Sequence, residues 1–394
     1  MTPEQIIKSH REAVIKRGEE CKSVLVVQDT TEVSYTSHRK VKGLGFINQS
    51  KQRGIKLHSC LAVSGEGEPL GLLHQEGWSR KQRKGKKEQR KKLPIAQKES
   101  YRWLTTLSAA EAGWEESAHL VHIADREADI FELFAHPRRR NSDLLIRAQQ
   151  NRKIEHELGY LMVAGAQGPV LGRVEIELQR NPKRKARRAQ LCCRAMGVRL
   201  DVPKHHAKSA GLEPIELNVI WVEEEEQPED GTQPIRWVLL TTLPIEKFEQ
   251  VWQCVQWYTH RWLIERFHYT LKSGCGVEEL QLNTQERLHK GLAVYSIVAW
   301  RVMWMLYYGR SNPEESCEKI LHEEEWQLLR RKFAPRSRKK PPKLQQAIVW
   351  IARLGGFLAR KGDGMPGVKT LWRGLTALQL MVEGGKLMTK SCPP

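Results

Sequence analysis

Short apolar runs separated by polar turns dominate the first third of the chain. Runs of four to eight apolar and β-branched residues are typical of buried β-strands. Strands are predicted at Ser23–Asp29, Ser59–Ser64, Pro69–Gln75 and His119–Asp125. Glu99–Ala112 has apolar residues at helical spacing, and a second helix is expected to start within Arg126–His136. This part of the chain is therefore predicted to combine a sheet with helices.

The pattern changes to alternating, strand-like segments between Asp143 and Thr242. The segments are Asp143–Gln149, Pro169–Leu178, Arg188–Val202, Ile215–Glu225 and Arg236–Thr242. A basic turn, Arg180–Arg188, and an acidic turn, Glu223–Gly231, separate some of them. Alternation of this kind predicts an antiparallel β region inserted into the fold.

Long helices are predicted from Ile245 to about Tyr308, and again after a Pro-containing turn, with a basic linker at Pro335–Lys343. The expected organisation has four parts. They are residues 1–142 (first part of a catalytic core), 143–242 (β insertion), 243–309 (core completed) and 310–394 (helical C-terminal region).

Composition indicates a soluble globular protein, because 40% of the 394 residues are hydrophobic and 28% are charged. The longest apolar stretch, Gly291–Tyr308, contains Arg301 and is short for a membrane span. The N-terminal segment is polar and amphipathic and does not resemble a secretion signal. We therefore expect no membrane association and a cytoplasmic, nucleoid-associated protein.

The eight cysteines contain no CxxC pair, and the adjacent Cys192 and Cys193 lack a second pair of ligands at zinc spacing. A disulfide framework is not expected in a chain of this size without a secretion signal. The cysteines are predicted to be reduced.

Charge favours a polyanionic partner. Lys and Arg number 65 against 46 Asp and Glu, a formal net charge of +19. Nucleic acid is the commonest partner for such a surplus, and a host with generally basic proteins is the alternative. The basic stretches Ser79–Leu93 and Arg180–Arg188 are expected either to contact a nucleic-acid backbone or to be solvated tracts.

The strongest local signal is the segment Tyr258–Lys272, which no Pro or Gly interrupts and which is predicted to be one helix. At about 100° per residue, Arg261, Glu265 and Lys272 would lie within roughly 60° of Tyr258. One phenol, one guanidinium, one carboxylate and one ammonium would then share a stripe, which suits a phosphate and a divalent metal. The alternative is a solvated face with intrahelical ion pairs such as Arg261–Glu265.

Two further acids favour the metal interpretation. Asp29 and Asp125 are each predicted to close an apolar strand. Together with Glu265 they form a ligand set for two Mg²⁺ or Mn²⁺ ions about 3.5–4 Å apart. Asp125 could instead cap the following helix, and Glu127 and Asp129 are nearby competitors as ligands.

The spacing of Tyr258, Arg261, Glu265 and Lys272 resembles the YREK signature of bacterial insertion-sequence DDE transposases of the IS-four family, the Tn-five-like cut-and-paste group. QDTTEVSY around Asp29 and DREADI around Asp125 resemble the first and second acid motifs of that family. GLLHQEGW (Gly71–Trp78) and WIARLGGF (Trp350–Phe357) are also similar to family segments.

The resemblance implies an α/β, ribonuclease-H-like catalytic core with an inserted antiparallel β region and an all-helical C-terminal dimerisation domain within Pro341–Met388. It implies Asp29, Asp125 and Glu265 as catalytic metal ligands, for Mg²⁺ with Mn²⁺ as a substitute. Phosphate-contacting residues would be Tyr258, Arg261, Lys272 and Arg147. Trp237 would stack on a flipped base, with the alternative that it is a core residue, and Trp262 is a second stacking candidate that could equally be core.

The implied activity is metal-dependent cleavage of DNA, hairpin formation and strand transfer by a homodimer in a synaptic complex with transposon ends and target DNA. In the family, a helical end-binding domain precedes the first acid by more than the 28 residues present here. The main alternative is therefore an N-terminally truncated inhibitor or remnant that dimerises with full-length transposase. A nonspecific nuclease or RNA-binding protein with the same core is a weaker alternative.

Overall fold

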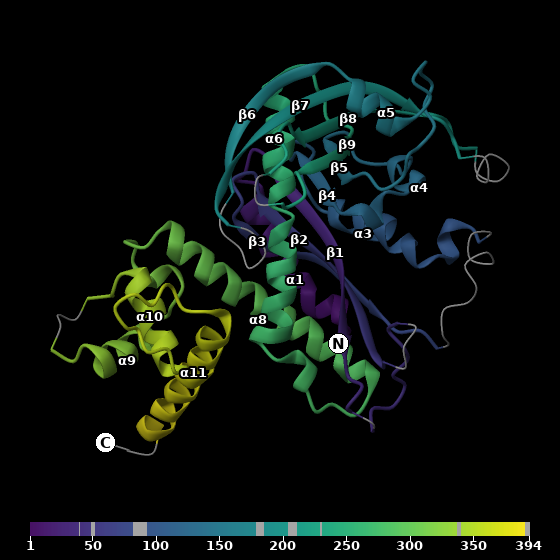
Figure 1. Ribbon diagram of the computed structural model, residues 1–394. Helices are drawn as coiled ribbons and strands as arrows, with labels where there is room; N and C mark the ends of the chain where they lie inside the picture. Colours follow the sequence, from purple (N-terminus) through teal and green to yellow (C-terminus); the bar gives the residue numbers. More distant parts are fainter. Residues whose placement is uncertain are drawn as a thin grey trace.

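A nine-stranded mixed sheet forms the centre of the molecule, with the strand order β3-β2-β1-β4-β5-β9-β8-β7-β6 (Figure 1). The computed structural model describes residues 1–38, 40–48, 52–81, 93–178, 185–203, 211–228, 231–336 and 340–390, without the side chains of 388–390. The strands are β1 (Val24–Ser34), β2 (Gly54–Ser64), β3 (Pro69–Trp78), β4 (Leu120–Ala124), β5 (Ser142–Arg147), β6 (Val170–Leu178), β7 (Arg187–Leu200), β8 (Ile215–Glu224) and β9 (Arg236–Thr241).

The two halves of the sheet differ in strand direction. β1, β2 and β3 form an antiparallel meander, whereas β4 and β5 run parallel to β1. From β5 onward every pairing is antiparallel, through β9, β8, β7 and β6. The strands of the predicted β region thus continue the main sheet rather than forming a separate one.

The prediction that Asp29 closes its strand is wrong. β1 continues for five residues beyond Asp29 and pairs with β2 as far as Ser34 opposite Gly54. Thr30, Thr31 and Val33 are β-branched and favour extended backbone, so the strand persists after its apolar run ends.

Helices cover both faces of the sheet and also form a separate lobe beside it. They are α1 (Pro3–Gly18), α3 (Arg102–Glu111), α4 (Phe131–Phe134), α5 (Leu161–Gln167), α6 (Phe248–Thr259), α7 (Trp262–Tyr269), α8 (Gln285–Ser311), α9 (Glu323–Phe333), α10 (Leu344–Leu354) and α11 (Val368–Lys390). Side chains of α6, α7 and α8 pack on one face in a core that includes Val27 and Ile123. Those of α3, α4 and α5 pack on the other face in a core that includes Ala124 and Leu144. Each fully buried Leu, Ile or Val in these cores contributes about 1.5–3 kcal/mol.

The C-terminal helices form a third core. Buried residues of α9, α10 and α11 pack with the second half of α8, and Figure 1 shows them as a lobe beside the sheet, reached through α8. Within the described part of the chain, none of the helices has the length and apolar character needed to cross a membrane.

The prediction of one uninterrupted helix over Tyr258–Lys272 is also wrong. α6 ends at Thr259 and α7 begins at Trp262, and between them the amides of His260 and Arg261 donate to carbonyls three residues earlier. Lys272 lies in a separate π-helical turn, Thr270–Gly274. These tighter and wider turns rotate the later residues relative to Tyr258, and no Pro or Gly marks the tighter turn at His260 in the sequence.

The helix expected to start within Arg126–His136 is likewise divided. A 3-10 turn covers Arg126–Ala128, and α4 begins only at Phe131. Asp129 lies between the 3-10 turn and α4. Its carboxylate accepts hydrogen bonds from the amides of Gln149 and Gln150 at 2.6 and 2.7 Å.

Candidate active site

Asp29 and Asp125 meet because of the parallel pairing of β1 and β4. Val27 lies opposite Ile123 in this pairing, and each aspartate follows two residues later. Neighbouring strands lie about 4.8 Å apart and side chains alternate between faces, so the two carboxylates lie next to each other. Burial and then the charge of Asp125 raise the pKa of Asp29. The structure therefore brings the first two predicted acids together.

Asp125 also acts as a cap. Its Oδ1 accepts a hydrogen bond from the amide of Glu127 at 2.9 Å, at the start of the 3-10 turn Arg126–Ala128. The capping alternative is thus confirmed. It does not exclude a role in metal binding, because a cap occupies one oxygen of the carboxylate.

Glu265 lies on α7, and the guanidinium of Arg261 lies between it and Asp29. Arg261 Nη2 donates to Glu265 Oε1, and Arg261 Nη1 lies 3.6 Å from Asp29 Oδ2. Arg261 therefore bridges the first and third acids. With this bridge in place, no group of three or more His, Cys, Asp or Glu side chains in the described ranges is arranged to hold a metal ion.

Negative charge is concentrated at Asp29. Burial, the neighbouring charge of Asp125 and the charge of Glu265 raise its pKa from 3.8 to about 6, against the opposing effects of the Thr30 amide and Arg261. A buried carboxylate beside other carboxylates gains from a nearby cation, because the cation favours its ionised form. The three acids therefore fit a divalent cation by the chemistry of their oxygen atoms.

A second cluster lies beside the acids, where β5 ends and β9 begins near α6. Arg147 closes β5 and pairs with Leu239 of β9, which also carries Trp237. The ring of Trp237 meets that of Tyr258 edge-to-face, with centroids 6.1 Å apart. Burial raises the pKa of Tyr258, and the charges of Arg261 and Arg147 oppose this effect. Arg147, Trp237 and Tyr258 are thus brought together.

Trp237 is half-buried and packs against the main core, so both interpretations of this residue remain compatible with its position. Trp262 is 58% exposed, which contradicts its alternative as a core residue. Neither Trp262 nor Lys272 has a hydrogen bond or ion pair with the three acids among the described residues. Lys272 instead lies near His268, whose pKa burial and the Lys272 charge lower to about 3.

The two competing acids have other partners. Asp129 is 4% exposed and forms an ion pair with Arg152. Glu127 accepts a hydrogen bond from Arg102 Nη2 at 2.7 Å. Sequence reasoning did not single out Arg102, because its contact with Thr30 spans 72 residues and follows no local spacing.

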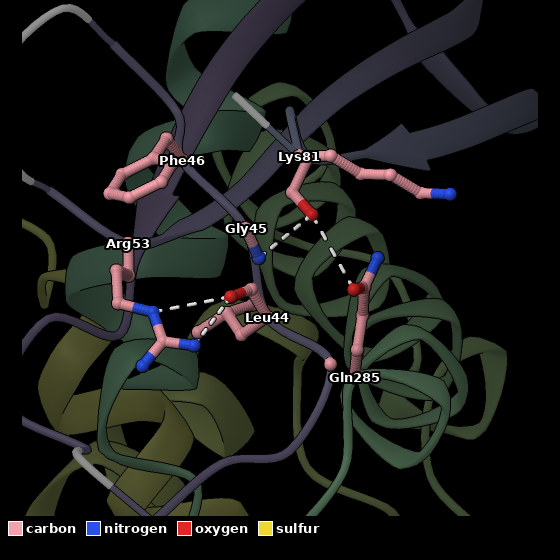
Figure 2. Close-up of a pocket in the computed structure, with 8 residues that line it drawn as sticks. Leu44, Gly45, Phe46, Arg53, Lys81 and Gln285 are labelled. Atoms are coloured by element: carbon pink, nitrogen blue, oxygen red, sulfur yellow. Dashed lines mark hydrogen bonds between the residues drawn. The ribbon is translucent and has the colours of Figure 1, made fainter. Parts of the chain in front are cut away.

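A basic pocket of about 590 Å³ lies beyond the end of β1 and is lined in part by Arg53, Ser79, Lys81 and Gln285 (Figure 2). Ser79 Oγ accepts a hydrogen bond from the Gly45 amide at 3.1 Å and donates to Gln285 Oε1 at 3.4 Å. Lys81 extends away from these groups. It begins the basic stretch Ser79–Leu93, of which residues 82–92 lie outside the described residues, as do 180–184 of the stretch Arg180–Arg188.

Comparison with protein families shows the family of the chain. The family model described as "Transposase DDE domain" matches residues 20–300, more than half of the chain and the whole of the site described above. The chain belongs to the DDE transposases. A second model, described as "Transposase Tn5 dimerisation domain", matches residues 297–392 of this transposase and indicates the Tn5 type.

Family membership makes the transposase a nucleotidyl-transfer enzyme that acts on DNA and uses a divalent metal ion, typically Mg²⁺ or Mn²⁺. The second match also suggests that the transposase forms a homodimer. The mixed sheet with helices is consistent with a ribonuclease-H-like core.

Proposed function

We propose that the chain is a cut-and-paste DNA transposase of the IS-four family, in which Asp29, Asp125 and Glu265 are the catalytic metal ligands. The register of β1 and β4, which places Asp29 beside Asp125, carries this proposal. Glu265 completes the set because Arg261 links it to Asp29.

The three carboxylates would hold Mg²⁺, with Mn²⁺ as a substitute, since both ions prefer oxygen ligands. Two such ions, when bound, would lower the pKa of the attacking water or hydroxyl and stabilise the leaving oxygen. Arg261 offsets part of the negative charge of Asp29 and Glu265, and its guanidinium is available to a DNA phosphate once other cations take over this role.

Tyr258, Arg261, Lys272 and Arg147 are proposed to contact phosphates of the cleaved strand end. Trp237 is proposed to stack on a base that leaves the duplex when a hairpin forms, and the exposed Trp262 is a second stacking surface. Water would attack one strand, and the freed 3′-hydroxyl would attack the opposite strand to close a hairpin. A second water would reopen the hairpin, and the same 3′-hydroxyl would join target DNA. These later steps rest on the resemblance to the family.

Residues 1–142 and 243–309 would form the ribonuclease-H-like core, residues 143–242 the β insertion, and residues 310–394 the dimerisation domain. The match to the Tn5 dimerisation model and the separate core of α9, α10 and α11 support the last of these assignments. A homodimer would pair two transposon ends with target DNA in a synaptic complex within the nucleoid.

The test is cleavage of labelled duplexes that carry the terminal repeats flanking the gene, with the purified chain and Mg²⁺, resolved on a denaturing gel. Discrete cuts and hairpins at the repeat boundary are expected from the wild type. Asp29→Asn, Asp125→Asn and Glu265→Gln should each abolish them while DNA affinity stays within about twofold. Glu279→Gln is the matched control, because Glu279 is exposed in the 3-10 turn Val277–Glu279.

Cleavage at the wild-type rate by Glu265→Gln would refute the assignment of the three acids. Tight, dimeric DNA binding without cleavage under any metal condition would contradict the enzymatic proposal and favour a regulatory partner of an active transposase.

A further inference from the structure

Arg102, the first residue of α3, has a side chain that is only 10% exposed and that reaches both aspartate-bearing segments. Its Nε donates to Thr30 Oγ1 at 2.9 Å, and its Nη2 donates to Glu127 Oε2 at 2.7 Å. Its Nη1 donates to the Glu99 carbonyl at 2.9 Å. One planar guanidinium therefore joins its own segment to two segments that are distant in sequence.

The two residues that Arg102 holds are the two that bind the aspartates. The amide of Thr30 donates to Asp29 Oδ1 at 2.7 Å, and the amide of Glu127 donates to Asp125 Oδ1 at 2.9 Å. Each aspartate thus has one oxygen bound by the backbone amide of a neighbouring residue, Thr30 or Glu127. The side chain of that same residue is hydrogen-bonded to Arg102. The guanidinium is the shared support of the two carboxylates.

We infer that Arg102 is a positioning residue that sets the separation of Asp29 and Asp125, and through it the spacing of the metal ions that these acids would hold. This inference rests on the proposed function. Arg102 does not touch the metals or the DNA in this account, and its effect passes through Thr30 and Glu127.

Packing fixes the guanidinium itself. Its carbon lies 5.0 Å from the ring centroid of Trp103 and 5.7 Å from that of Trp78, in cation–π contact with both. Lysine has one flexible ammonium and cannot reproduce a planar fork that reaches three acceptors in fixed directions. Arginine is therefore required by geometry as well as by charge.

The Thr30 hydroxyl has a second partner besides Arg102, the ring of His58. The hydroxyl lies 2.9 Å from Nδ1 of the fully buried His58, and His58 Nε2 lies 3.3 Å from Gln28 Oε1. Burial and then the charge of Arg102 lower the pKa of His58, so the ring is neutral. A neutral ring that accepts from Thr30 at Nδ1 donates to Gln28 from Nε2. With the Arg102 donor on its other side, the Thr30 hydroxyl has one orientation.

The test compares Arg102→Lys and Arg102→Met with Arg187→Lys in the full chain. Arg187 is a matched control because it is also a part-buried arginine paired with a carboxylate, Glu224, but in the β7–β8 region. Two readouts are needed: the Mg²⁺ concentration for half-maximal cleavage of terminal duplexes, and Mn²⁺ binding to the DNA-bound chain by electron paramagnetic resonance.

Arg102→Lys should raise the half-saturating Mg²⁺ concentration and weaken Mn²⁺ binding by about tenfold or more, as loss of a residue that orients metal ligands does. DNA affinity should change by less than about twofold, and Arg187→Lys should leave both metal readouts unchanged. Thr30→Val should shift both readouts in the same direction, which decides the matter if the Arg102 variants do not fold.

Full rescue by lysine would show that only charge matters and would overturn the positioning role. Wild-type metal dependence in Arg102→Met or in Thr30→Val would overturn it as well. Failure of the wild type itself to cleave would instead contradict the proposed function, so the two failures are distinguishable.

Discussion

Asp29 is the residue at which the electrostatic cost of the site is concentrated. It is buried beside Asp125, and its pKa is raised to about 6 although an amide and Arg261 stabilise its ionised form. At neutral pH the folded chain therefore holds a carboxylate whose ionised form is less stable in this site than it would be in water. Such costs are common at functional sites, where groups are arranged for reactivity rather than for stability.

Replacing this charge should stabilise the fold. Because the folded pKa of Asp29 lies above its ordinary value of 3.8, the destabilisation is absent below about pH 4 and complete above about pH 6. Asp29→Asn should accordingly raise the free energy of unfolding at pH 8 without metal by about 1–3 kcal/mol. The gain should disappear toward pH 4, as measured by denaturant titration at both values. A variant that is equally or less stable at pH 8 would show that the carboxylate is not strained.

Alanine substitutions of the two tryptophans near the site should have different effects on the free energy of unfolding. Trp237 is half-buried against the core and Trp262 is 58% exposed. Trp237→Ala should reduce the free energy of unfolding by about 1–3 kcal/mol, whereas Trp262→Ala should change it by less than about 0.5 kcal/mol.

On DNA, Trp237→Ala should reduce hairpin formation on nicked ends more than it reduces the first nick, in a gel assay that follows both products. Equal losses at both steps would contradict base stacking by Trp237 and leave it a core residue.

At the scale of elements, the pairing of strands determines which acidic residues lie together in the site. Parallel alignment of β1 with β4 turns two aspartates almost 100 residues apart into neighbours, and the break between α6 and α7 directs Arg261 and Glu265 toward them. The tighter turn at His260 alters the direction of the chain just before Arg261. A straight helix would present these side chains differently relative to Tyr258.

Much of this could be predicted and some could not. The apolar runs before Asp29 and Asp125 identified both strands, and the motif around Glu265 supplied the third acid through resemblance. The extension of β1 and the break after Thr259 depend on pairing with β2 and on tertiary packing, which local propensity does not contain. The contact of Arg102 with Thr30 depends on the complete fold.

The packing of α10 on α11 depends on two glycines. A Cβ at Gly374 would lie 1.8 Å from the Ile351 carbonyl oxygen, and one at Gly355 would lie 2.0 Å from that of Thr370. Gly374→Ala should therefore destabilise the C-terminal lobe by about 1–3 kcal/mol or more and lower the dimer fraction in sedimentation. Gly384→Ala in the same helix is the control, since nothing lies within 4 Å of its Cβ, and it should stabilise by up to about 1 kcal/mol. Unchanged stability and dimerisation in Gly374→Ala would contradict this packing.

At the scale of the whole molecule, α8 joins the catalytic sheet to the lobe. The two family matches overlap at residues 297–300, inside this helix. Its first half packs in the core with α6 and α7, and its second half packs with α9, α10 and α11. Trp300, Trp304 and Tyr308 stack in succession along it, and Trp300 Nε1 donates to the Pro69 carbonyl at 2.8 Å. A partner bound at the lobe would therefore have a defined position relative to the acids.

Asp29, Asp125 and Glu265 come from three separate segments and are proposed to hold the same metal ions. The most direct measurement replaces Mg²⁺ with Fe²⁺ in the DNA-bound chain, generates hydroxyl radicals with ascorbate and peroxide, and maps the cuts on end-labelled protein. Three sets of cuts are expected, near residues 29, 125 and 265, that excess Mg²⁺ suppresses together and that Glu265→Gln weakens together. Cuts at unrelated positions, or cuts near one acid that persist when another is replaced, would contradict this proposal.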